Sequence, residues 1–173
     1  LLNGSKNLSE TFAKLENEKL AVTFSSKGAQ PYSAQVKDYR NYDSTDLYIF
    51  KDGMSRMNIS VKAGESINTD DFVYDLVQSN DSLLVYRLAF AGGGYIEHKY
   101  CLAKDSYLID SEVSFNGGIL PRNVHSFDMD WNVIVPRMEK GYKNEKMYSK
   151  INFLYQETSK PEIVGRGRDQ EKR

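Results

Sequence analysis

The histidines are the residues of this chain best suited to proton transfer, because an unperturbed imidazole titrates near neutral pH. There are two of them, His98 and His125. Glu97 directly precedes His98, so the pair offers a general acid and a general base side by side. Adjacent side chains of a strand point to opposite faces, however, and Glu97 and His98 cannot converge on one substrate atom unaided. We therefore expect His98 to be a half-buried, hydrogen-bonded histidine at the edge of the core.

The acidic residues Asp128 and Asp130, with His125 nearby, are the candidate ligands for a metal ion. Two carboxylates at positions i and i+2 of a strand are more simply its solvent-facing side. The sequence shows no further cluster of ligands around them. We expect these residues to keep the strand soluble and predict no metal site.

Three other features have both a chemical and a structural interpretation. Trp131 could stack on a sugar, but its place between Met129 and Val133 in the apolar alternation predicts a core residue. Cys101 is the single cysteine and has no Cys-x-x-Cys context, so we expect a structural thiol. Gly92-Gly93-Gly94 lacks the following helix of a phosphate loop, which favours a hairpin turn. The sequence thus predicts no catalytic, cofactor-binding or metal-binding residue.

The composition is that of an ordinary globular domain that favours strands. A chain of 173 residues can bury roughly 70% of its unfolded surface. Its 12 Tyr and 8 Phe against 4 Pro are typical of half-buried strands. A net charge of -1 argues against a nucleic-acid partner or an anionic lipid surface. No stretch approaches the roughly 20 uninterrupted apolar residues of a membrane span.

Apolar and polar residues alternate along most of the chain, as they do in strands with one buried face. The clearest segments are residues 20–25, 32–36, 83–91, 95–102, 107–115 and 126–135. Polar turns such as Lys51-Asp52-Gly53 separate the segments. Residues 138–150 are crowded with Lys and Glu and predict an excursion or a short helix before a strand at 151–156. The pattern predicts an all-β fold, an antiparallel two-sheet sandwich with at most minor helix.

The segment from Leu20 to Tyr39 predicts a hairpin closed at Ser26-Lys27-Gly28 and contains Val36-Lys37-Asp38-Tyr39. Leu15-Glu16-Asn17-Glu18-Lys19-Leu20 precedes it and Asn41-Tyr42-Asp43 follows it. In this order the segments resemble the opening of the large periplasmic domain of the YidC-type membrane protein insertases. Residues 95–109 and 147–155 resemble later strands of that domain, so the resemblance covers roughly residues 12–157.

The resemblance bears on two local details. It makes residues 11–15 a strand, although Leu8 to Leu15 could otherwise form one or two helical turns with Ser9 as N-cap. The family has a second turn glycine where this chain has Ala29. Because alanine incurs a steric cost at positive φ, we expect the left-handed residue of the turn to be Gly28.

The resemblance implies a large twisted β-supersandwich, similar to galactose mutarotase, over residues 10–158. Residues 1–9 would be a linker or an end, and residues 159–173 a linker or frayed tail. The domain would lie on the periplasmic face of the inner membrane of a Gram-negative bacterium, as a monomeric part of a multi-pass protein. The expected partners are accessory subunits of the Sec translocon and nascent membrane proteins, with no cofactor.

The function implied by the resemblance is that of a non-catalytic scaffold or docking domain, which assists insertion and folding of inner-membrane proteins. The alternative is a carbohydrate-binding or aldose-epimerase-like protein on the same fold. Mutarotases use histidines with a glutamate as acid and base, and Glu97-His98 superficially offers both. A sugar site would need a cleft with exposed aromatic rings and convergent polar groups.

Overall fold

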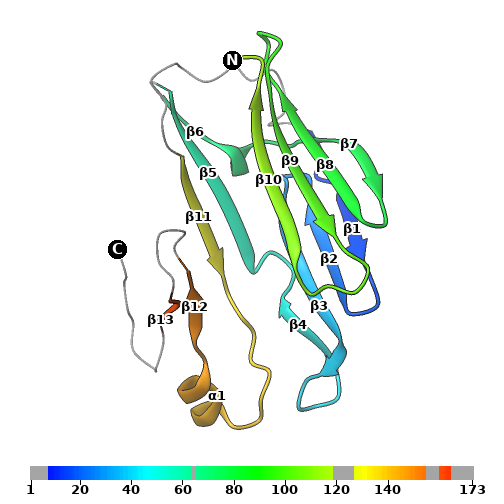
Figure 1. Ribbon diagram of the computed structural model, residues 1–173, viewed down its shortest axis with the longest axis vertical. Coiled ribbons are helices and arrows are strands. Elements are labelled where there is room, and N and C mark those ends of the chain that lie inside the picture. The colour runs from blue at the N-terminus through cyan, green and yellow to red at the C-terminus, as the bar shows by residue number, and fades with distance from the viewer. Residues whose placement is uncertain (1–7, 64, 119–126, 155–159, 165–173) are drawn as a thin grey trace. The chain divides into compact units, whose positions relative to one another are not determined.

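A computed structural model of the chain describes residues 8–63, 65–118, 127–154 and 160–164 (Figure 1). The chain forms two compact units. The first unit comprises Leu1–Arg40 and Asp46–Pro136, and the second comprises Asn41–Thr45 and Arg137–Arg173. Each unit is described by itself below.

Two four-stranded antiparallel sheets make up most of the first unit. The first sheet has the order β1-β2-β3-β4, with strands Phe12–Glu16, Leu20–Ser25, Gln30–Arg40 and Asp46–Phe50. The second has the order β10-β9-β8-β7, with strands Ile109–Asn116, Tyr95–Leu102, Leu83–Ala89 and Asp75–Asn80. Consecutive strands are neighbours in both sheets, because short hairpin turns join them.

The core of the first unit lies between these two sheets. Its buried side chains come from both, and include Leu15, Val22 and Phe24 from the first sheet and Leu84 and Ile96 from the second. The ring of Phe24 lies 4.4 Å from that of Tyr100 across the interface. Asn17, in the β1-β2 turn, donates to the carbonyls of Ala103 (2.7 Å) and Ser106 (2.8 Å) after β9. Side chains and turns thus hold the sheets together.

A third sheet in the same unit has the order β11-β5-β6, with strands Asp128–Val133, Ser55–Ala63 and Glu65–Asn68. Strands β5 and β6 are followed by a 3-10 turn, η2 (Thr69–Asp71), whose Thr69 hydroxyl accepts the Ile59 amide at 2.9 Å. Strand β11 forms one border of this sheet and pairs with β5 from Val133↔Ser55 to Asp128↔Ser60.

The second unit contains one helix, α1 (Tyr142–Tyr148), and a hairpin of β12 (Ile151–Phe153) with β13 (Glu162–Val164). The Tyr42 amide donates to the Met138 carbonyl at 3.2 Å, and the Arg137 guanidinium lies 5.7 Å from the Tyr42 ring. No helix within the described ranges has the length and apolar character needed to cross a bilayer.

The structure confirms the all-β prediction with little helix, and it confirms a strand rather than helical turns before Asn17, with the bounds Phe12–Glu16 where we expected 11–15. The likeness to galactose mutarotase stays a prediction, as do the domain bounds 10–158. Strand β13 lies in the segment for which we expected a linker or tail.

The prediction for Trp131 is wrong. This side chain is 51% exposed, although it alternates with Met129 and Val133 as expected. Its cross-strand neighbour Met57 is 7% exposed. The buried core side chains reach β5, but on β11 only Val133 packs against them, partly buried, so Met129 and Trp131 lack cover. Alternation identified the face but not its burial.

Candidate functional site

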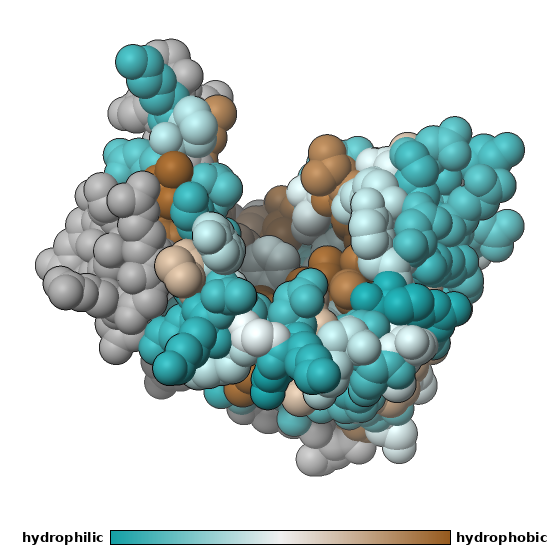
Figure 2. Space-filling view, turned by 90° about the horizontal axis from the view of Figure 1, so that it is seen from below, coloured by the Kyte–Doolittle hydropathy of each residue, from teal (hydrophilic) through white to brown (hydrophobic). Residues whose placement is uncertain are grey.

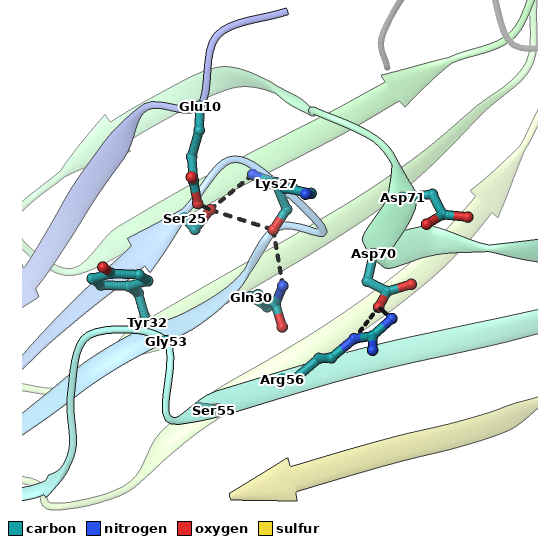
Figure 3. Close-up of a pocket in the computed structure, with 10 residues that line it drawn as sticks. All are labelled: Glu10, Ser25, Lys27, Gln30, Tyr32, Gly53, Ser55, Arg56, Asp70 and Asp71. Atoms are coloured by element: carbon teal, nitrogen blue, oxygen red, sulfur yellow. Dashed lines mark hydrogen bonds and ion pairs between the residues drawn. The ribbon is translucent and has the colours of Figure 1, made fainter. Parts of the chain in front are cut away.

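A polar cavity of about 260 Å³ opens on the first unit, where the tip of the β2-β3 hairpin meets the start of β5 and the η2 turn (Figure 3). Charged residues of both signs line it, namely Glu10, Lys27, Arg56, Asp70 and Asp71. Uncharged lining residues include Ser25, Gln30, Tyr32 and Ser55. The Tyr32 ring also packs against Phe12, with the ring centroids 4.7 Å apart.

The hairpin tip forms one wall of the cavity through two left-handed residues. Gly28 has φ 73° and Ala29 has φ 48°, so the expectation for Gly28 is confirmed but Ala29 adopts the same region. The Gly28 amide donates to the Phe72 carbonyl at 2.8 Å, and the Tyr74 amide donates to the Ser26 carbonyl at 2.8 Å. The tip is therefore anchored to the segment that follows η2. A Cβ on Gly28 would lie 3.0 Å from the Asp70 Cα, so this position favours glycine through both its positive φ and its close contact.

A hydrogen-bonded network satisfies most polar groups on the hairpin side of the cavity. Ser25 Oγ donates to the Glu10 carboxylate at 2.5 Å and accepts the Lys27 amide at 2.9 Å. The Gln30 amide nitrogen donates to the Lys27 carbonyl at 3.1 Å, and its oxygen accepts the Met57 amide at 2.5 Å. Ser25 and Gln30 are therefore committed to holding the turn and the neighbouring strand, as such side chains commonly are.

An ion pair crosses the other side of the cavity. Arg56 Nε and Nη2 each lie 2.5 Å from Asp70 Oδ2. The Asp70 side chain is 4% exposed and that of Arg56 is 73% exposed, so a buried anion meets a cation that reaches solvent. Asp70 Oδ1 has no hydrogen-bond partner among the described residues. Asp70 therefore depends on Arg56 for its charge compensation.

His98 lies behind the hairpin tip, in a buried cluster of aromatic side chains. Its Nδ1 lies 3.3 Å from the Ala29 carbonyl, which also accepts the Tyr100 hydroxyl at 2.6 Å. The Tyr74 ring lies 5.2 Å from the imidazole. The predicted hydrogen bond of His98 is confirmed, but the side chain is fully buried rather than half-buried. The tip of the hairpin covers it, and no local sequence pattern could show that.

Burial sets the protonation state of this cluster. It lowers the pKa of His98 to about 4, against the smaller opposing effect of the hydrogen bond to Ala29. It also raises the pKa of Tyr100 well above its usual range and that of Tyr86 to about 12. Near neutral pH His98 is a neutral imidazole that donates through Nδ1. Its Nε2 has no partner among the described residues.

The structure separates the two members of the suggested acid–base pair. Glu97 lies on the opposite face of β9, where its carboxylate pairs with Arg87 at 2.8 Å. His98 faces the closed core. Two groups on opposite faces cannot act on the same substrate atom, so Glu97-His98 does not form a mutarotase-like dyad.

Apart from Trp131, the other described residues singled out from the sequence lie where they were expected. Gly93 has φ 89° in the β8-β9 turn, and its amide donates to the Phe90 carbonyl at 3.0 Å. Asp128 and Asp130 are exposed, and Cys101 is a partly buried thiol in β9. His125 lies outside the described residues. Within the described part of the chain, no three His, Cys, Asp or Glu side chains gather as metal ligands.

No pattern in the sequence pointed to Arg56, Asp70 or Gln30. Arg56 and Asp70 are 14 positions apart and meet only because η2 folds back on β5. Gln30 joins a strand 27 positions away. None of these residues belongs to a recognisable motif, since their pairing depends on tertiary structure. The cavity can hold a small polar group, but the side chains of Ser25, Gln30 and Ser55 already bond to other groups of the protein.

Comparison with known proteins shows that the chain is similar to membrane protein insertases. Eight curated relatives match it. One from Porphyromonas gingivalis is 30% identical over 150 residues, which are 84% of this chain and 24% of the relative. One from Phocaeicola vulgatus is 30% identical over 153 residues, 87% of this chain and 25% of the relative. Both are named membrane protein insertase YidC. This chain is a homologue of a segment of the YidC-type insertases.

The match confirms the resemblance drawn from the sequence. It extends to a relative from Cytophaga hutchinsonii that is 25% identical over 82% of this chain and 23% of its own length. The chain thus spans about a quarter of the length of the curated YidC relatives it matches. No family model and no solved structure matches the chain.

Proposed function

We propose that this chain is a periplasmic, non-catalytic scaffold segment of a YidC-type membrane protein insertase. The observation that carries the proposal is its similarity, at 30% identity over most of its length, to relatives named for that activity. The insertase would act at the inner membrane of a Gram-negative bacterium, on nascent membrane proteins. Accessory subunits of the Sec translocon would be its docking partners.

The geometry supports a scaffold rather than a catalyst. The buried imidazole of His98 is closed off from solvent, and Glu97 is engaged by Arg87 on the other face. The Ser25 hydroxyl, which lines the cavity, donates to Glu10 and accepts the Lys27 amide of the turn. A general base must reach the proton it abstracts in a plausible substrate pose, and none of these groups can do so.

A deletion in the intact insertase tests the docking role. Cells depleted of their own insertase would express either the intact protein or a form that lacks the segment matching residues 10–136. The two forms would be compared for copurification with Sec accessory subunits and for insertion of a Sec-dependent and a Sec-independent client. We expect loss of copurification and weaker insertion of the Sec-dependent client. Copurification unchanged by the deletion would contradict docking through this segment.

The alternative function, carbohydrate binding, draws support from one observation. Tyr32 lines the polar cavity beside Gln30 and Arg56, which is the combination of aromatic ring and polar groups that sugar sites use. NMR measurement of anomer exchange in a panel of aldoses, with the purified chain and its His98→Gln variant, tests the epimerase form of this alternative. We expect no acceleration by either protein. Acceleration that the variant loses would overturn the scaffold proposal.

A further inference from the structure

Strand β11 presents an apolar face that is open to solvent. Phe127, directly before the strand, is 42% exposed, and Met129 and Trp131 within it are 63% and 51% exposed. On the adjacent strand β5, the cross-strand partners Met57 and Ile59 are only 7% and 5% exposed. The same face of one sheet therefore passes from covered to uncovered between two neighbouring strands. We call Phe127, Met129 and Trp131 the β11 face.

The rings of the β11 face are held in place by the first unit. The Trp131 indole N–H donates to the buried Ser55 hydroxyl at 3.0 Å. Phe127 stacks on Phe115 of β10, with the centroids 4.5 Å apart and the planes within 10° of parallel. Apolar side chains also reach the surface as brown areas among teal in Figure 2. An ordered apolar face is better suited to a fixed partner than scattered exposed side chains are.

The backbone edge of β11 is open as well. Among the described residues β11 pairs only with β5, and the Ile134 amide donates to the Met54 carbonyl at 2.7 Å. This bond sets the phase of the antiparallel ladder, in which alternate amides point to opposite edges. The amides of Asp130 and Asn132 therefore point to β5, and those of Met129 and Trp131 point to the open edge.

The border strands β7 and β11 of the first unit differ in how regularly they pair with their neighbours. Strand β7 has a register shift between Leu76 and Gln78. By contrast, β11 pairs with β5 over six consecutive residues without a shift. Bulges are a common way of blocking a strand edge, so the regular edge of β11, beside an apolar face, is suited to the addition of another strand.

We propose that a β-strand from the rest of the insertase polypeptide pairs with the open edge of β11 and covers the β11 face. This inference depends on the proposed function, because it requires an insertase-length chain. About three quarters of the curated relatives lies outside the matched segment. A strand of the same polypeptide can hydrogen-bond to the open edge and bury the β11 face at the same time. It does so without the entropy cost of binding a separate molecule. Asp128 and Asp130 on the other face keep that side in water.

Cysteine labelling in the intact protein tests the proposal. In a Cys101→Ala background, with any other cysteine of the intact protein replaced, Met129→Cys places a thiol on the covered face. Asp130→Cys is the matched control on the opposite face of the same strand. We expect maleimide to modify both at similar rates in the 173-residue chain. In the intact insertase we expect Met129→Cys to react at least about tenfold more slowly than Asp130→Cys.

Hydrogen exchange on the unsubstituted protein checks the same surface without relying on variants that fail to fold. The amides of Met129 and Trp131 should exchange quickly in the 173-residue chain and slowly in the intact insertase. Those of Asp130 and Asn132 should be slow in both, since β5 already binds them. Rapid exchange at Met129 and Trp131 in the intact protein would overturn the proposal.

The remaining outcomes distinguish other occupants and the proposed function. Protection that appears only with an added client protein, or only at high concentration of the short chain, would assign the face to a client or to a second copy and overturn the proposal. Insertion activity is measured separately in depleted cells. Slow exchange at Met129 and Trp131 in a protein that fails to support insertion would preserve the β11 inference and contradict the proposed function. Rapid exchange at these amides in a protein that supports insertion would contradict the β11 inference and preserve the proposed function.

Discussion

Strands β9 and β11 carry the same alternation of apolar and polar residues but differ in their surroundings. In β9, Ile96 and Leu102 are at most 2% exposed, whereas Met129 and Trp131 in β11 are more than half exposed. Strand β9 lies inside a four-stranded sheet, opposite the first sheet of the unit, while β11 borders a three-stranded sheet. The difference teaches that alternation records which face a strand would bury, and that neighbouring elements decide whether burial occurs.

The largest effect should come from truncating the covered strand. Ile96→Ala should lower the free energy of unfolding by about 2 to 5 kcal/mol, because it removes buried apolar atoms and leaves a cavity between the sheets. Urea unfolding followed by circular dichroism would measure the change. A loss of under about 1 kcal/mol would mean that the two sheets are not tightly packed at this position.

Acid should lower the free energy of unfolding, because His98 in β9 becomes protonated when the protein unfolds. The pKa of His98 is lowered by burial to about 4, from a usual value of 6.5. Between these values the unfolded state binds a proton that the folded state does not. The contribution of neutral His98 to the free energy of unfolding is therefore fully present above pH 6.5. About 3 kcal/mol of it is lost as the pH falls to 4. Urea unfolding at a series of pH values measures this loss.

The control for the acid effect is His98→Gln, which removes the titrating group. Carboxylates titrate in the same range in both proteins, so the difference between the two pH profiles isolates His98. We expect the variant to have the shallower profile. If the free energy of unfolding depends on pH in the same way in both proteins, the pKa of His98 is not lowered in the folded state.

A smaller effect should follow from disturbing the hairpin tip that covers His98. Gly28→Ala should destabilise the protein by about 1 to 2 kcal/mol, because the residue has φ 73° and the added Cβ would lie 3.0 Å from the Asp70 Cα. Gly53→Ala is the matched control, since Gly53 has φ 81° but no atom within 4 Å of an added Cβ. If both substitutions lower the free energy of unfolding equally, the positive φ accounts for the whole effect and the close contact with Asp70 contributes nothing.

The smallest effect should be that of truncating the uncovered strand. Met129→Ala in the 173-residue chain should change the free energy of unfolding by under about 1 kcal/mol, because most of the side chain is already in water. The same unfolding assay as for Ile96→Ala gives a direct comparison. A loss equal to that at Ile96 would contradict the uncovered state of the β11 face.

The sequence was informative where structure is local. Alternation located β8, β9 and β11, and the Gly92-Gly93-Gly94 turn was predicted from composition and context alone. The resemblance to the insertases corrected the helical pattern before Leu15 and thereby predicted β1. These features depend on residues within about ten positions of one another, which a single sequence displays directly.

The errors concern contacts between residues distant in the sequence. Trp131 is exposed because no described element lies over it, and His98 is buried because the turn 69 positions earlier covers it. Ala29 adopts positive φ although glycine is the usual residue there, and its carbonyl binds both His98 and Tyr100. No local pattern shows that Arg56 and Asp70 pair across the cavity. Burial and pairing of this kind require the three-dimensional fold.

The position of the Ala29 carbonyl has a consequence for the order of folding. Its two donors, His98 and Tyr100, come 69 and 71 residues later in the chain. During synthesis the β2-β3 hairpin therefore emerges long before the strand that completes its tip. Contacts this far apart close slowly, because the intervening chain must first be ordered. Until β9 is complete, the early hairpin exposes an apolar face that a holdase chaperone could bind.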